Sequence, residues 1–136
     1  MKLAISVLVI IHLVVLAWHG EAHAALAIEL PALKTLFVYI VVVAAPIISA
    51  ALAWTRFSIF GICLFAFAMA GSFLFGAYHH YVLVSPDNIA HLPTGLDAAH
   101  SQFIESAAYL ASVALFSSFL GFSMLGYEYA NREKVA

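Results

Sequence analysis

Four long apolar runs, separated by polar connections, constrain the fold of this chain more than any other feature. They lie at about residues 3–19, 33–54, 58–80 and 98–126. Each run approaches or exceeds the roughly 20 apolar residues that a helix needs to cross a bilayer. Only 9% of the residues are charged, compared with roughly 25% in soluble domains. The sequence therefore predicts an all-α protein, a four-helix transmembrane bundle that forms one integral membrane domain over residues 1–136.

The first run also fits an alternative interpretation, a cleaved signal peptide. Lys2 would be its basic start, and Ala22-His23-Ala24 has the form of a cleavage site. The run is long for a signal peptide, however, and it contains His12. We therefore expect a retained first span.

The few cations predict the orientation, because cytoplasmic connections carry an excess of Lys and Arg. With four spans, four of the five cations fall on one face, and the fifth, Lys34, falls on the other. The four are Lys2, Arg56, Arg132 and Lys134. We expect a protein of the plasma (inner) membrane with both termini cytoplasmic and the two long connections outside.

The connection over residues 81–97 contains a helix-start pattern. Ser85, Pro86 and Asp87 supply a capping hydroxyl, a proline at the first position and an acid in the first turn. The pattern predicts a short outer surface helix over about 86–91, stopped by Pro93.

Six of the seven histidines fall at the ends or connections that this topology places outside. His19 and His23 are four residues apart, so both imidazoles share one helix face and suit one metal ion. His79 and His80 are adjacent and differ by about 100° on a helix, so only one can face the bundle. Interfacial histidines without a ligand remain the alternative for both pairs.

Two acids accompany the remaining outer histidines. Asp87 and His91 have the spacing of a carboxylate that holds a metal-binding imidazole, and equally that of an ordinary surface pair. Glu105 follows His100 inside the fourth apolar run, where an unpaired acid is costly, so we expect it to face the bundle. The candidate ligands are thus His19, His23, His79, His91 and His100, with Asp87 and Glu105 as supporting acids.

Two residues within the spans have structural interpretations. Pro46 should kink the second helix and release a carbonyl that a neighbouring helix can satisfy. His12 lies about 10 Å along the helix axis from His19, too far for one ion to bind both. We expect His12 to hydrogen-bond a neighbouring helix.

Imidazoles with one or two carboxylates suit copper or zinc before iron. A haem at the outer rim, between His19 or His23 and His79 or His80, is a further alternative. The sequence contains no nucleotide-binding loop, nucleophile elbow, HExxH or CxxC motif, and its net charge of −2 with no basic cluster argues against a nucleic-acid partner.

Two neighbouring stretches resemble an uncharacterised group of small four-span prokaryotic membrane proteins. That group has a G-x-Y-x-H stretch before SPD-x-x-x-HLP, and this chain has the same patterns within residues 76–81 and 85–93. The resemblance covers mainly residues 71–110. It implies the four-helix architecture and points to His79, Asp87 and His91. A purely contextual likeness is to small helical accessory subunits of membrane-bound oxidases and monooxygenases.

Three functions follow as hypotheses. The first is a protein that holds a metal ion at the outer face, as an accessory subunit and not an enzyme on its own. The second is a purely structural subunit of a larger membrane complex, and the third a small oxidoreductase with a rim-bound haem. The expected partners are the lipid bilayer and other membrane subunits or further copies of the chain.

Overall fold

The computed structural model describes residues 1–94 and 97–133, with side chains placed as far as residue 131, and its regular structure is entirely helical. The elements, in chain order, are α1 (Lys2–Ala25), α2 (Ala32–Phe37), the π-helical segment η1 (Val38–Ala44), α3 (Ala45–Ala53), α4 (Ser58–Ala77), the π-helical segment η2 (Tyr78–Val82) and α5 (Asp97–Glu133).

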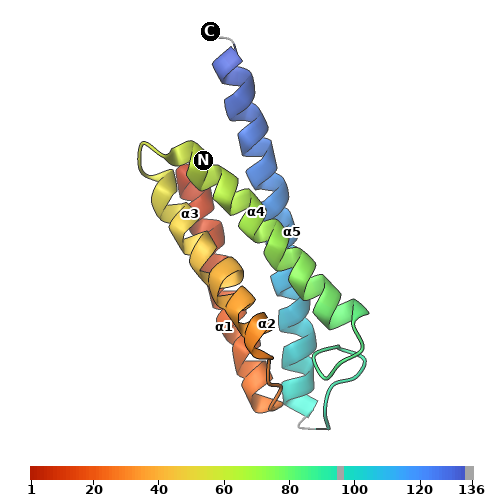
Figure 1. Cartoon of the computed structure of the whole chain (residues 1–136). Coiled ribbons are helices and arrows are strands. Elements are labelled where there is room, and N and C mark those ends of the chain that lie inside the picture. The colour runs from red at the N-terminus through yellow and green to blue at the C-terminus, as the bar shows by residue number, and fades with distance from the viewer. Residues whose placement is uncertain (95–96, 134–136) are drawn as a thin grey trace.

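These elements form four long rods (Figure 1). The second rod joins α2, η1 and α3 over Ala32–Ala53, and the third joins α4 and η2 over Ser58–Val82. All four rods are long and apolar enough to cross a membrane. Large apolar side chains such as Leu3, Leu74 and Phe119 are about two-thirds exposed, as expected of side chains that face lipid. The predicted all-α membrane architecture is confirmed at this level.

The four rods pack as one helix bundle. α5 contacts α1 and α4, and α3 contacts the same two helices. Glycines allow the closest approaches. A Cβ on Gly61 would lie 2.7 Å from the backbone nitrogen of Ala53, and one on Gly121 would lie 2.8 Å from the Cβ of Ala66. Small residues therefore set the distances between helices, as is common in membranes.

The proline in the second rod is compensated as expected. Pro46 has no N–H to give to the carbonyl of Val42, four residues earlier. The Nε2 of His12, which is fully buried, lies 3.1 Å from that carbonyl oxygen and donates to it. The prediction that His12 bonds a neighbouring helix is confirmed, and its partner is the carbonyl that the proline leaves unpaired.

The beginning of α1 and the end of α5 lie at the same end of the bundle, and the two long connections lie at the other (Figure 1). α1 continues through Gly20 to Ala25, six residues beyond the predicted span. His19 and His23 therefore share one helix face at the end that carries the connections. Lys134, which contributed to the orientation prediction, lies outside the described residues.

The predicted short helix over 86–91 is absent, and residues 83–94 form turns and bends. The side chain of Asn88 explains this difference. Its Oδ1 accepts the N–H of Ala90 at 2.9 Å, and its Nδ2 donates to the carbonyl of Leu83 at 3.0 Å. Such local bonds compete with helical ones. The N–H of Ile89 donates instead to the carbonyl of His80 at 3.0 Å, which holds the connection against the end of η2.

Candidate metal centre

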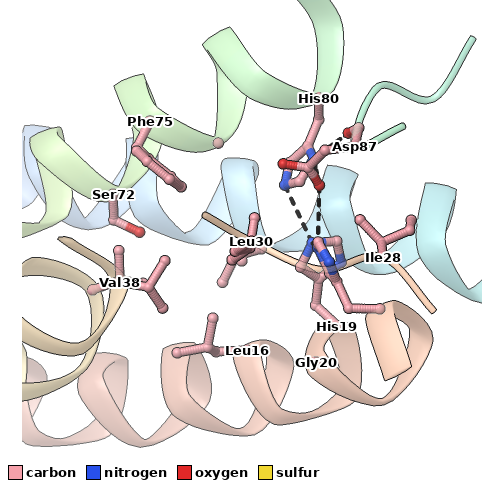
Figure 2. Close-up of a pocket in the computed structure, with 14 residues that line it drawn as sticks. Leu16, His19, Gly20, Ile28, Leu30, Val38, Ser72, Phe75, His80 and Asp87 are labelled. Atoms are coloured by element: carbon pink, nitrogen blue, oxygen red, sulfur yellow. Dashed lines mark hydrogen bonds and ion pairs between the residues drawn. The ribbon is translucent and has the colours of Figure 1, made fainter. Parts of the chain in front are cut away.

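Three histidines from two rods meet at the end of the bundle that carries the long connections. His19 and His23 come from the last two turns of α1, and His80 comes from η2 (Figure 2 labels His19 and His80). One ring nitrogen from each lies within 4.8 Å of the other two. The Nε2 of His19 is 3.1 Å from the Nε2 of His23 and 3.2 Å from the Nε2 of His80.

The tautomers of two rings follow from their second nitrogens. The Nδ1 of His80 lies 2.9 Å from the backbone carbonyl of Asp87, which can only accept, so Nδ1 carries the proton. The Nδ1 of His19 lies 2.9 Å from the hydroxyl of Ser106, which already donates to the carbonyl of Phe103. Ser106 therefore accepts from His19. In the neutral form of each ring, Nε2 is therefore the nitrogen with the lone pair, and the two Nε2 atoms face the same point.

Two unprotonated nitrogens at 3.2 Å repel each other, and a metal ion or a proton between them removes that repulsion. Imidazole nitrogens bind zinc at about 2.0–2.1 Å, so two nitrogens of a tetrahedral site are separated by roughly 3.3 Å. The two shortest separations in this cluster are close to that value. By contrast, two axial ligands of one haem iron lie on opposite sides of the metal, so their nitrogens would be about twice a metal–nitrogen distance apart, roughly 4 Å. The two separations from His19 therefore favour a single ion over a haem with His19 as an axial ligand.

Asp87 adds a negative charge beside the cluster. Its side chain is 6% exposed, and Oδ1 lies 3.3 Å from the Nε2 of His23 and 3.3 Å from the Nδ1 of His80. These are ion-pair distances, and neither carboxylate oxygen accepts a well-directed hydrogen bond. Burial acts to raise the pKa of Asp87, but the N–H of His80 and the positive charge that the imidazoles carry when protonated outweigh it and hold the pKa below its ordinary value. The carboxylate is therefore ionised and partly unsatisfied, which suits a neighbouring cation.

Phe103, on α5, seals the cluster from the side. It is fully buried, and its ring centroid lies 4.8 Å from that of His19, 5.0 Å from that of His23 and 5.3 Å from that of His80. His19 and His80 are only 4% and 6% exposed. A site walled by apolar groups strengthens the interaction of an ion with its ligands, because water screens it less.

A cavity of about 270 Å³ opens beside the histidines. Figure 2 shows its polar end at His80 and Asp87 and its other end near Ser72 and Val38. Apolar side chains supply most of the wall between them. They include Leu16, Ile28, Leu30, Val42, Phe75 and Leu110.

The structure brings together some of the predicted ligands and not others. His19, His23 and Asp87 meet as described above. His91 is exposed in the outer connection, and the Nε2 of His100 donates to the carbonyl of Pro93 at 2.7 Å.

Two further expectations change in the structure. Glu105 is exposed on α5, so the expectation that it faces the bundle is wrong. Its place on the inner face is taken by the next residue, Ser106. His79 lies outside the cluster, where its Nδ1 is 3.2 Å from the ammonium nitrogen of Lys34 and its ring packs on Phe75.

His80 is the cluster member that the sequence reasoning did not select. Ser72, Gly76 and His80 follow each other at four-residue steps, and all three line the cavity. That spacing of small residues indicates the inward face of the third rod and could have distinguished His80 from His79. The last histidine of the G-x-Y-x-H stretch is also His80.

No protein-family model, no curated protein and no solved structure matches this chain.

Proposed function

We propose that this chain is a membrane subunit that holds one metal ion, zinc or copper before iron, between His19, His23 and His80. The observation that carries the proposal is the convergence of three Nε2 atoms, two of which are the lone-pair nitrogens of the neutral rings, beside the buried carboxylate of Asp87. Imidazole nitrogens suit zinc and copper, and the separations of 3.1 and 3.2 Å fit tetrahedral coordination.

The set of mutually close ligand atoms consists of the three imidazole nitrogens, and among the described residues Asp87 is not part of it. A tetrahedral ion held by three protein ligands keeps one position free. The role of Asp87 in this proposal is to fix the ring of His80 and to offset part of the charge of the ion. Such outer partners typically change metal affinity by about 10–100-fold.

The adjacent histidines provide a matched test. His79 and His80 are 8% and 6% exposed, so their replacement removes similar buried rings. Protein purified without chelators should contain close to one equivalent of metal by elemental analysis. His80→Ala should lose it, while His79→Ala should keep it. Equal metal content in the two variants, or a metal-free wild-type protein that takes up neither zinc nor copper, would contradict the proposal.

We place the centre on the outer face, from the cation distribution of the connections. Single cysteines at Thr94 and Thr55, both exposed at opposite ends of the bundle, test this in a Cys63→Ala background. A membrane-impermeant thiol reagent applied to intact cells should label the cysteine at position 94 and not the one at 55. The reverse pattern would place the centre at the cytoplasmic face.

We further propose that the subunit is an accessory to a membrane enzyme complex and does not act as an enzyme alone. Support comes from the few polar groups at the centre, where Asp87 is the one carboxylate lining the cavity in the described part of the chain. The purified, metal-loaded protein should migrate with a partner subunit when it is isolated from its native membrane. A monomer or simple homo-oligomer under those conditions would argue against the accessory role.

A further inference from the structure

The cavity beside the histidines differs from ordinary packing defects, because one end is polar and the rest of its wall is apolar. Its polar atoms are concentrated at the three histidines and Asp87, and the remaining wall is almost entirely aliphatic or aromatic. Binding sites for small molecules have this character, with a few convergent polar groups in an apolar pocket. Its volume of about 270 Å³ is just below the roughly 300–1,000 Å³ typical of ligand pockets, which suits a small ligand.

The cavity also has a direction. Ser72 and His80 lie on one face of the third rod, eight residues apart, which corresponds to about 12 Å along a helix. The cavity therefore runs along the third rod from the proposed ion toward the middle of the bundle.

The charge at the polar end selects the ligand. A divalent ion held by imidazole nitrogens brings positive charge into this apolar site, and a buried net charge is costly. An anionic oxygen group at the free position of the ion would offset that charge. An apolar chain attached to that group would fill the rest of the cavity.

Resting on the metal site proposed above, we infer that the cavity binds a single-chain amphiphile with an anionic oxygen head, of the class of medium-chain carboxylates. The head occupies the free position of the ion between His19, His23 and His80. The chain extends past Phe75 toward Ser72. The molecule enters from the lipid, since its chain is already dissolved there.

Cobalt-loaded protein in lipid nanodiscs tests this inference, because the visible spectrum of cobalt(II) changes when a new ligand binds. Octanohydroxamate and acetohydroxamate carry the same metal-binding head and differ only in the chain. Ser72→Phe fills the end of the cavity far from the ion. Leu74→Phe, on the exposed side of the same helix, is the matched control.

Excluding even one methylene from an apolar pocket changes binding by about 10–200-fold. Ser72→Phe should therefore weaken octanohydroxamate at least about tenfold, while acetohydroxamate and the cobalt content stay unchanged. Leu74→Phe should bind both probes as the wild type does. Partition of the probe into the bilayer is common to all variants, so it cancels in the comparison.

Val38→Trp fills the cavity from η1 and serves as the second variant if Ser72→Phe fails to fold. Unchanged octanohydroxamate binding in these cavity-filling variants would overturn the inference and leave the metal site intact. Loss of cobalt from both would also overturn it, since the cavity would then support the ion and not a ligand. A wild-type protein that binds no cobalt, zinc or copper would refute the metal site itself, which distinguishes the two failures.

Discussion

Ser106→Ala tests how the protein orients the nitrogen of His19 that faces the other two histidines. In the wild type, the hydroxyl of Ser106 accepts the Nδ1–H of His19 at 2.9 Å, and both residues are buried, at 0% and 4% exposure. This bond leaves Nε2 unprotonated and available to a metal. Without the hydroxyl, the ring of His19 in the metal-free protein can move its proton from Nδ1 to Nε2. In the metal-bound protein Nε2 is occupied, so Nδ1 must keep its proton without an acceptor. The free-energy cost of this unpaired N–H therefore falls mainly on the metal-bound state.

The magnitude follows from the burial of that N–H. A buried donor without an acceptor costs about 1–3 kcal/mol, and about 1.4 kcal/mol is tenfold in a binding constant. Ser106→Ala should thus weaken zinc binding by roughly 5- to 150-fold, which brackets the about 10–100-fold found for outer partners of metal-binding histidines. Competition against a zinc-binding dye of known affinity in detergent solution measures this change.

The same helix offers a control for the loss of a serine. Ser112 lies on the exposed side of α5, and its hydroxyl donates only to the carbonyl of Ala108 at 2.8 Å. Ser112→Ala should leave the zinc affinity within about twofold of the wild type, as surface changes rarely exceed about 0.5 kcal/mol. If Ser106→Ala binds zinc as tightly as Ser112→Ala, the bond from His19 to Ser106 does not prepare the site, and the assignment of its tautomer is wrong.

Two further predictions concern the bundle itself. His12→Phe should destabilise the wild-type protein by about 1–3 kcal/mol, because the carbonyl of Val42 loses its donor in a water-poor interior. The loss should be much smaller in a Pro46→Ala background, where residue 46 regains an N–H. Equal losses of unfolding free energy in both backgrounds, measured in mixed micelles, would contradict this pairing. Gly121→Leu should lower the free energy of unfolding by about 1–3 kcal/mol or more, because its Cβ would lie 2.8 Å from that of Ala66. A Cβ on Gly126 would meet nothing within 4 Å, so Gly126→Leu should melt like the wild type.

The sequence by itself determined the number and character of the helices. Four apolar runs with few charges leave no other way to satisfy the backbone in a bilayer, so the membrane bundle was predictable. The same local reasoning related Pro46 to a carbonyl in need of a donor, and it paired His19 with His23, since four residues bring two side chains to one helix face.

Only the tertiary structure decided which remote groups meet. Asn88 diverts the outer connection into turns, and the fold then places Asp87 on His80. Whether His79 or His80 faces inward depends on the rotation of the third rod. The four-residue spacing of Ser72, Gly76 and His80 indicates that rotation, but only the packed structure shows which groups His80 then meets. The wall of apolar side chains beside the histidines has the same origin, because a cavity is what remains when four separate helices have packed.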